Sequence, residues 1–359
     1  MKHYIMVWLP FLFFFGAAAQ KLQPGFNKQE YVELLKLTAK NSELEFGKNI
    51  PYPERFTLRY RSATVGLDNV WELWLSADSM AVISIRGSTV NAESWLANFY
   101  AAMVPAKGEL KLSDTDTFRY ELTQNPLAAV HAGWLLAMAF LSKDILQHID
   151  MCYQAGIKDF YMVGHSQGGA ISFLMTAYLH SLQNQHLLPA DIRFKTYCSA
   201  APKPGNLYFA YAYETMTQGG WAYSVVNAAD WVPEVPFSVQ TTDDFNEVNP
   251  FPLIRELIKK QRFPKNIILK RLYNKLDKPS RKAQKNYRKY LGQMMSKAVQ
   301  KHIPDFSPPA YFKSNNYVRT GNPVILNGDE TYFSAFPVDK EKFMTHHSFD
   351  AYLLLAEKL

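Results

Sequence analysis

The sequence predicts an α/β fold, in which helices cover both faces of a mostly parallel sheet. Apolar runs of strand character alternate with helical segments along most of the chain, which is typical of a largely parallel sheet. Between residues 160 and 182 an apolar run passes through a short glycine-containing turn into a helix. The segment 251–304 interrupts the alternation, and we expect a basic helical insertion there.

Each element is assigned from its own pattern. The first helix is predicted at 27–42, because its leucines and Tyr31 fall on one face. Strands rich in β-branched and aromatic residues are expected at 55–62, 69–76, 80–87, 193–200, 222–230 and 317–326. Further helices are expected at 128–149, 170–185 and 340–359.

Composition and charge fit a globular protein with one unusual segment. A length of 359 residues, with 48% hydrophobic and 20% charged residues, suits a single α/β domain with an insertion. The net charge of +7 is unevenly distributed. Residues 251–304 hold sixteen Lys or Arg against Glu256 and Asp277, which gives this segment +14 and the rest of the chain about −7.

The N-terminus has the pattern of a signal peptide. Lys2 precedes an apolar run at 4–15 and the small residues 16–19. We expect a signal peptide at 1–19 and a mature domain at 20–359 that is secreted, periplasmic or associated with the cell surface. A membrane anchor is the alternative, but the run is shorter than the roughly 20 residues that a spanning helix needs.

The two cysteines, Cys152 and Cys198, are too few for a disulfide framework in an exported protein. Both are expected to be buried thiols, with a single bridge as the alternative.

The turn after residue 163 has the sequence GHSQG, which matches the G-x-S-x-G nucleophile elbow of α/β-hydrolases. In this elbow the serine occupies a strained strand-to-helix turn, and the neighbouring glycines relieve the crowding. Ser166 is therefore the predicted nucleophile. A serine hydroxyl also needs a base, an acid that orients the base, and donors for the developing oxyanion.

The acid and the base follow the serine along the chain in α/β-hydrolases. Asp230 ends a strand before two prolines, which predicts a carboxylate at the carboxyl edge of the sheet. A local loop cap is the alternative for this residue, and Asp243 and Asp244 are the reserve candidates. His346 or His347, at the entry to the final helix, supplies the base.

The oxyanion donors are expected from two places. One is the backbone N–H of Gln167, the residue after the nucleophile, and the other is Ser88, on the loop after an earlier strand. His131 and His165 precede or adjoin the nucleophile, so they fit supporting roles, or they are ordinary buried histidines.

Six motifs occur in an order that matches a known family. They are VISIRGS followed by a tryptophan, VHAGW, VGHSQGGA, CSAAPKPGN, VVNAADWVPEVP and HHSFDAY. Together they resemble the class 3 lipases, the fungal-type triacylglycerol lipase family of the α/β-hydrolase superfamily, over residues 55–240 and 315–355.

The resemblance implies Ser166 as nucleophile, Asp230 as acid, and Ser88 with Gln167 as oxyanion donors. Segments of this family usually place an aromatic residue five positions after the histidine. On that basis the final motif selects one of the two histidines.

Tyr352 is the aromatic residue that selects His347 as the base, and His346 remains the alternative. The family usually has leucine directly after the nucleophile, whereas this chain has Gln167. We therefore expect a polar side chain near the site.

The resulting prediction is a secreted lipase or esterase that cleaves acylglycerol or related lipid esters through an acyl-enzyme. No metal or organic cofactor is expected, and the expected partner is the lipid ester, with no nucleic acid and a monomeric chain. A phospholipase A1, an acyltransferase and a non-catalytic lipid- or surface-binding protein are the alternatives.

Two segments have two interpretations each. Residues 91–104 carry apolar side chains at helical spacing, which fits either core packing or a short lid. Residues 251–304 fit either a solvated helical hairpin or a contact with an anionic lipid surface.

Overall fold

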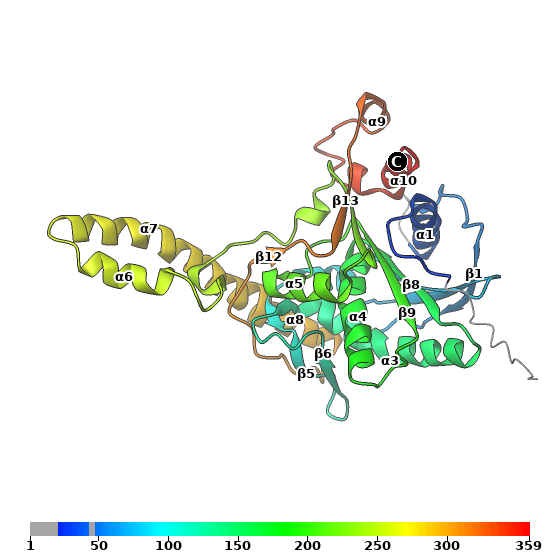
Figure 1. Ribbon diagram of the computed structural model, residues 1–359, viewed down its shortest axis with the longest axis horizontal. Helices are drawn as coiled ribbons and strands as arrows, with labels where there is room; N and C mark the ends of the chain where they lie inside the picture. The colour runs from blue at the N-terminus through cyan, green and yellow to red at the C-terminus, as the bar shows by residue number, and fades with distance from the viewer. Residues whose placement is uncertain (1–20, 43–46) are drawn as a thin grey trace, which may run out of the picture.

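The computed structural model describes residues 21–42 and 47–359, which are built around a seven-stranded sheet (Figure 1). The strands lie in the order β1-β2-β3-β8-β9-β11-β13. The first two pairings are antiparallel, and those from β3 to β13 are parallel. The predicted α/β fold with a mostly parallel sheet is therefore confirmed. The strands are β1 (Phe56–Arg61), β2 (Trp71–Ser76), β3 (Ala81–Ile85), β8 (Asp159–His165), β9 (Arg193–Ser199), β11 (Ala222–Asn227) and β13 (Asn322–Leu326).

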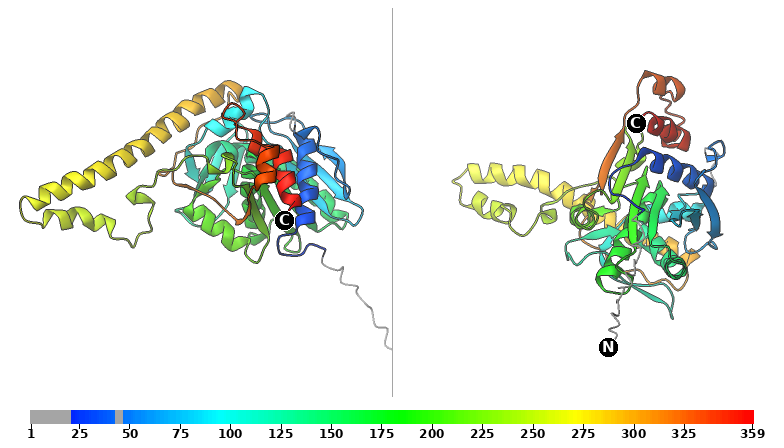
Figure 2. Two further views of the ribbon diagram at one scale, coloured as in Figure 1. Left: turned by 90° about the horizontal axis from the view of Figure 1, so that it is seen from above. Right: turned by 45° about the vertical axis from the view of Figure 1, so that its right-hand side comes forward.

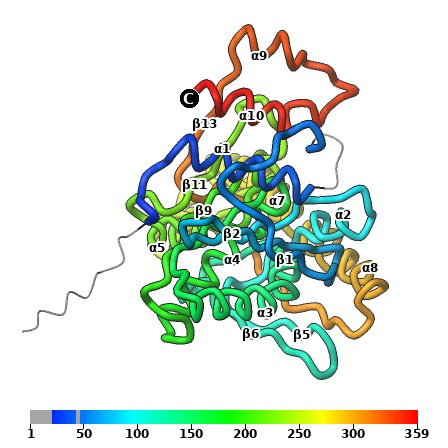
Figure 3. The backbone as a smooth tube through the Cα atoms, turned by 90° about the vertical axis from the view of Figure 1, so that its right-hand side faces the viewer, coloured from blue at the N-terminus to red at the C-terminus, as the bar shows by residue number. Residues whose placement is uncertain are grey.

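Helices cover both faces of the sheet, and each face has its own hydrophobic core. Along β8, Phe160 and Met162 pack with α3 and α4, whereas Tyr161 and Val163 pack with α1 and α10. This alternation is the two-residue period of a strand that is buried on both faces. Figure 3 shows α1, α9 and α10 together on one side of the molecule and α3 on the other. The helices are α1 (Lys28–Asn41), α3 (Ala132–Gln154), α4 (Gln167–Asn184), α5 (Leu207–Met216), α9 (Glu330–Ala335) and α10 (Phe349–Glu357).

The helix predicted at 128–149 begins later than expected. Residues 129–131 form a strand of a second sheet, and His131 then caps α3 because its Nδ1 accepts a hydrogen bond from the Trp134 N–H at 3.3 Å. This sheet has the order β12-β10-β7-β4, and a separate hairpin joins β5 to β6. The strands are β4 (Met103–Pro105), β5 (Lys107–Lys111), β6 (Thr117–Glu121), β7 (Ala129–His131), β10 (Gly205–Asn206) and β12 (Tyr317–Val318).

Two other helices are shorter than predicted. The helix after β3 is α2 (Ala92–Phe99), so the last apolar positions of 91–104 lie outside it, in a loop and in β4. The final helix, α10, begins only after a short turn, η5 (Thr345–His347), and Ser348 caps it by accepting a hydrogen bond from the Ala351 N–H. Local hydrogen bonds of this kind are favoured by serine at a helix start.

The segment 251–304 lies between β11 and β13 and is helical. Figures 1 and 2 show α6 and α7 as a hairpin that projects from the body, and the longer helix of the pair runs back onto the body. The elements are α6 (Phe251–Lys259), α7 (Lys265–Asn286), a π-helical stretch η4 (Tyr287–Met294) and α8 (Met295–His302).

Three sequence-based expectations concern the rest of the chain. The predicted signal peptide, residues 1–19, lies outside the described residues. Within the described part of the chain, none of the helices has the length and apolar character needed to cross a bilayer. Cys152 and Cys198 are both buried and unbridged, as the thiol interpretation expected.

Candidate active site

The turn between β8 and α4 has the geometry of a strained elbow. Ser166 has φ 58°, in the left-handed region that most residues avoid. Its neighbours explain why glycine is needed on both sides. A Cβ on Gly164 would lie 2.2 Å from the Gly168 backbone, and a Cβ on Gly168 would lie 2.1 Å from the Ile85 carbonyl oxygen. The turn therefore holds Ser166 at the start of α4, close to the end of β3.

Asp230 and His347 form a buried hydrogen-bonded pair. His347 Nδ1 lies 2.7 Å from Asp230 Oδ2, and both side chains are almost fully buried. The same carboxylate oxygen accepts a hydrogen bond from the Tyr352 hydroxyl at 2.8 Å, and Oδ1 accepts one from the Val232 N–H at 2.9 Å. Because the carboxylate can only accept, this contact favours the tautomer of the neutral imidazole that carries its proton on Nδ1 and has an acceptor at Nε2. The spacing of five residues between His347 and Tyr352 brings both to the same carboxylate.

His346, the alternative base, points elsewhere. Its Nδ1 lies 2.7 Å from the Tyr332 hydroxyl, and its backbone carbonyl accepts a hydrogen bond from Asn227. Its neighbours place it beside α9 rather than at Asp230. The structure thus brings His347, and not His346, to the predicted acid.

The reserve acids lie in a different network. Asp243 binds Arg281 at 2.8 and 2.9 Å, and this guanidinium lowers the pKa of the carboxyl below its usual range. Asp244 forms a capping box with Thr241 and accepts a hydrogen bond from Ser314. Asp243 thus holds the base of the helical segment, and Asp244 joins the loops of Thr241 and Ser314.

His131 and His165 are buried and bonded to the backbone. Burial lowers the pKa of His131 to about 3, and its Nε2 lies 3.2 Å from the Asn98 carbonyl oxygen. Burial also holds the pKa of His165 well below its ordinary value. His165 Nε2 lies 3.0 Å from the His347 carbonyl oxygen, and its Nδ1 lies 3.1 Å from Ser199 Oγ, which in turn lies 2.8 Å from the Tyr31 hydroxyl. His165 therefore fixes the backbone of the segment that carries His347.

The polar side chain of Gln167 is buried and binds the loop of Ser88. Gln167 is 2% exposed, and its Oε1 accepts a hydrogen bond from Ser88 Oγ at 3.1 Å. Its Nε2 donates to the Ser94 carbonyl at 3.2 Å. Ser88 Oγ also accepts a hydrogen bond from Asn98 Nδ2 at 2.9 Å. The proton of this hydroxyl is already donated to Gln167, so the backbone N–H of Ser88 is the donor that remains for an oxyanion.

Helix α2 is attached to the body by the same set of bonds. Asn98 Oδ1 accepts a hydrogen bond from Trp134 Nε1 at 2.9 Å, and Trp95 Nε1 donates to the Thr89 carbonyl at 3.0 Å. A Cβ on Gly133 would lie 1.9 Å from the Ala97 carbonyl oxygen, so α2 and α3 are in very close contact. These contacts favour the packed-helix interpretation of the segment over a lid.

Ser166 and His347 line one cavity of about 400 Å³. Its walls are largely apolar, and they come from the loops after β3 and β11, from η4 and from the segment before α10. The apolar lining includes Val90, Phe99, Trp231, Val235, Phe237, Leu291, Met344 and Phe349. A largely apolar, partly enclosed cavity with a few polar groups at its base suits a ligand with a hydrocarbon chain.

Sequence reasoning missed two residues of this site. Asn98 and Ser94 bind the loop of Ser88 to Gln167 and α3, and neither was singled out. Their signal was a pair of polar residues four positions apart on an otherwise apolar helix, a spacing that places both on one face.

Comparisons with known proteins agree with the resemblance. A family model described as Lipase (class 3) matches residues 82–240. A secreted mono- and diacylglycerol lipase of Fusarium solani is 27% identical over 156 residues, which cover 43% of this chain and 39% of that protein. The toxin TseL of Vibrio cholerae is 24% identical over 224 residues, which cover 55% of this chain and 32% of that protein. The chain thus spans about a third of the length of TseL and about two fifths of the length of the Fusarium lipase.

Among solved structures, lipase II from Rhizopus niveus aligns with a TM-score of 0.42 at 20% identity, covering 58% of this chain and 75% of that one. The sheet order, the elbow and the histidine on the segment before α10 define an α/β-hydrolase. The part of the chain that the class 3 lipase model matches, residues 82–240, includes β3, the elbow and the loop of Asp230.

Proposed function

We propose that this chain hydrolyses carboxylic esters of lipids, with acylglycerols as the substrate class, through an acyl-enzyme on Ser166. One observation carries the proposal. The hydrogen-bonded pair of His347 and Asp230 opens onto the same apolar cavity as the strained Ser166. The class 3 lipase model that matches residues 82–240 and the name of the Fusarium relative support the choice of ester and lipid.

In the proposed reaction, His347 Nε2 takes the proton of Ser166 as the hydroxyl oxygen attacks the ester carbonyl. The oxyanion is held by the backbone N–H groups of Ser88 and Gln167. Collapse of this intermediate breaks the ester bond, and His347 gives its proton to the departing alcohol. Water, activated by the same imidazole, then releases the fatty acid. Asp230, held by Tyr352, stabilises the imidazolium in both steps.

The proposal extends to location and partner. The pattern of residues 1–19 supports export, with residues 20–359 as one hydrolase domain that contains the insertion 251–304. The charge of that insertion supports contact with an anionic lipid surface, and a monomer suffices for the reaction. These statements rest on sequence pattern and charge.

The test compares the mature chain with Ser166→Ala on p-nitrophenyl butyrate, p-nitrophenyl palmitate, an emulsified triglyceride and phosphatidylglycerol vesicles. We expect turnover by the parent and none by the folded variant. Preference for the long-chain esters and the triglyceride supports a lipase. Release of fatty acid mainly from the vesicles identifies a phospholipase, and transfer of the acyl group to added alcohol identifies an acyltransferase. A folded parent that turns over none of these esters refutes the proposal.

A further inference from the structure

The projecting hairpin of α6 and α7, residues 251–286 and here called the arm, is both basic and apolar. It holds twelve Lys and Arg against Glu256 and Asp277. It also leaves large apolar side chains in solvent, among them Leu276 at 71% exposed and Phe263, at the turn between the two helices, at 79%. The exposed apolar side chains that lie within the two helices are Leu253, Leu257, Ile267, Ile268, Leu272 and Leu276. A monomeric soluble protein rarely exposes such a cluster unless it binds something there.

Most of these side chains form one face of the arm. The positions at which the two helices pack on each other are partly buried, and they are Ile254, Ile258, Leu269 and Tyr273. The position just before each of them is exposed, and these positions are Leu253, Leu257, Ile268 and Leu272. Antiparallel helices in contact are related by a two-fold axis perpendicular to their common plane, so equivalent positions point to the same side. Leu276, one turn after Leu272, extends this set, and we call the five residues the apolar face.

Basic residues border the apolar face. Lys260 lies three positions after Leu257, and Lys275 lies three positions after Leu272, a spacing that places each beside the apolar face. The other side of α7 is more basic. Ile267 shares a surface there with Lys270, Arg271 and Lys278, and Lys275 lies at the boundary between the two sides. An apolar strip flanked by lysines is the pattern of a helix that lies in a membrane interface.

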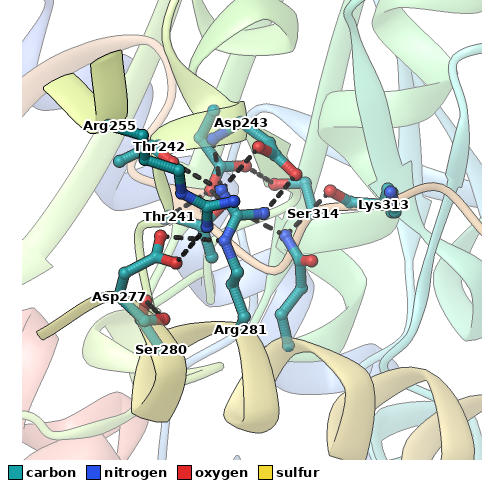
Figure 4. A network of polar contacts seen from close by, with 11 residues as sticks. Thr241, Thr242, Asp243, Arg255, Asp277, Ser280, Arg281, Lys313 and Ser314 are labelled. Carbon is teal, nitrogen blue, oxygen red and sulfur yellow. Dashed lines mark hydrogen bonds and ion pairs between the residues drawn. The ribbon is translucent and has the colours of Figure 1, made fainter. Parts of the chain in front are cut away.

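The base of the arm is firmly attached to the body (Figure 4). Asp277 is buried and binds Arg255 of α6 at 3.1 Å and Arg281 of α7 at 2.8 Å, which joins the two helices. Arg281 also binds Asp243 of the body at 2.8 and 2.9 Å, and Gln284 donates to the Lys313 carbonyl at 2.9 Å. A charged side chain with several partners of this kind fixes an orientation better than an isolated surface pair.

The arm is also continuous with the wall of the cavity. α7 passes without a break into η4, where Tyr287 and Leu291 line the cavity of Ser166. In η4 the Tyr287 hydroxyl donates to the Phe237 carbonyl at 2.7 Å, and the Leu291 carbonyl accepts from the Ala102 N–H at 3.0 Å. Any surface to which the arm binds therefore lies at a fixed position relative to the cavity of Ser166.

We propose that the apolar face of the arm docks on an anionic lipid surface, with its leucines in the acyl region and the bordering lysines against the headgroups. This deepens the proposed function, on which it rests, by naming the face that delivers the cavity to its lipid. The excess of ten positive charges on the arm selects anionic lipid, and the exposed apolar face selects a lipid surface over a soluble polyanion.

The experiment uses the full mature chain carrying Ser166→Ala, so that the lipid stays intact and binding is measured without catalysis. Binding to vesicles of equal parts phosphatidylglycerol and phosphatidylcholine is measured by co-sedimentation. The variant Leu257→Gln/Ile268→Gln/Leu272→Gln is expected to bind about 100-fold more weakly. Ile267→Gln, on the basic side of α7, removes an equally exposed isoleucine and is expected to bind within about threefold of the parent.

A second readout locates the face directly. The two native cysteines are buried, so a single cysteine introduced as Leu257→Cys or Ile267→Cys takes an environment-sensitive dye selectively. We expect a blue shift on vesicle binding at position 257 and a much smaller one at position 267. The charge component is tested with Lys260→Gln/Lys265→Gln/Lys275→Gln, since Lys265, three positions before Ile268, also lies beside the apolar face. We expect this variant to bind about 100-fold more weakly and with a smaller salt dependence than the parent.

With Ser166 intact, the variant Leu257→Gln/Ile268→Gln/Leu272→Gln is expected to hydrolyse p-nitrophenyl butyrate like the parent. This result would show that the variant folds, and it would separate failed docking from failed catalysis. Docking is refuted if the parent does not bind these vesicles, or if the variant with glutamine at 257, 268 and 272 binds them as well as the parent does. It is also refuted if both dye positions respond alike. If the parent self-associates, the variant with glutamine at 257, 268 and 272 does not, and both bind vesicles equally, the apolar face would be assigned to a second copy of the chain instead.

Discussion

Replacing Gln167 by leucine, the usual family residue, tests whether the buried amide holds the loop of Ser88 in place. The change keeps the size of the side chain but removes its bonds to Ser88 Oγ at 3.1 Å, to the Ser94 carbonyl at 3.2 Å and to Ser94 Oγ at 3.4 Å. Each such neutral bond contributes about 0.5–1.5 kcal/mol, so the free energy of unfolding should fall by about 1.5–4.5 kcal/mol. If the freed loop carries an oxyanion donor, kcat/KM should fall by about 10- to 100-fold, because 1.4 kcal/mol corresponds to a factor of ten.

The assay is urea unfolding together with steady-state hydrolysis of p-nitrophenyl butyrate, on the parent, Gln167→Leu, Ser88→Ala and the double variant. Ser88→Ala keeps the backbone N–H and removes only the hydroxyl that bonds to the amide. We expect the double variant to lose less than the sum of the single losses, by about 0.5–3 kcal/mol, since both changes break one shared bond. Additive losses, or a Gln167→Leu variant with unchanged stability and kcat/KM, would show that the amide does not hold the loop.

Three further predictions concern the acid, a buried histidine and the elbow. Asp230→Asn should lower kcat by about 10⁴-fold while leaving the fold intact, as measured by circular dichroism and ester turnover, whereas a similar loss in Asp243→Asn would move the acid to Asp243. His131 has a pKa of about 3 in the folded chain and near 6.5 when unfolded, so its contribution to stability is complete above about pH 6.5 and is lost as the pH falls toward 3. His131→Gln should therefore reduce the slope of unfolding free energy against pH by up to about 1.4 kcal/mol per pH unit between about pH 6 and pH 4.5, and an unchanged slope in urea titrations would contradict this. Gly168→Ala should give little folded protein, because its Cβ would meet the Ile85 carbonyl. In the control Gly156→Ala the Cβ meets nothing within 4 Å, so the positive φ alone should lower the free energy of unfolding by about 1–2 kcal/mol. Equal yields and melting temperatures of the two variants would refute the steric argument.

The parts of the fold that the sequence predicted are those set by local chemistry. The elbow was predictable because the close approach of Gly164 and Gly168 to neighbouring backbone admits no side chain. The alternation of strands and helices was predictable because strands of the parallel sheet carry short apolar runs, such as residues 160–163 of β8, that are separated by segments with helical spacing. For the candidate site, the choice of His347 over His346 came from the family resemblance, through the aromatic residue that the family usually has five positions after the histidine. The structure shows a physical reason for that spacing in the bond from Tyr352 to the carboxylate of Asp230.

What the sequence did not predict depends on tertiary contacts. Residues 129–131 were expected in the helix at 128–149, yet they form a strand, because β4 and β10 lie on either side to pair with them. The helix at 92–99 stops short of Met103, because the chain there also joins that second sheet. The roles of Ser94 and Asn98 required knowing that α2 lies against both the elbow and α3.

In the chain of hydrogen bonds that ends at the His347 carbonyl, the donor and the acceptor of each bond can be assigned. A carbonyl oxygen only accepts, so the contact between His165 Nε2 and the His347 carbonyl places the proton of His165 on Nε2. Its Nδ1 must then accept from Ser199, and Ser199, with one proton to give, must accept from Tyr31. The order cannot be reversed at any link without leaving a buried polar group unpaired. Tyr31, on the first helix, is the first donor of this chain of bonds, so loss of that helix would weaken the chain and loosen the segment that positions the base.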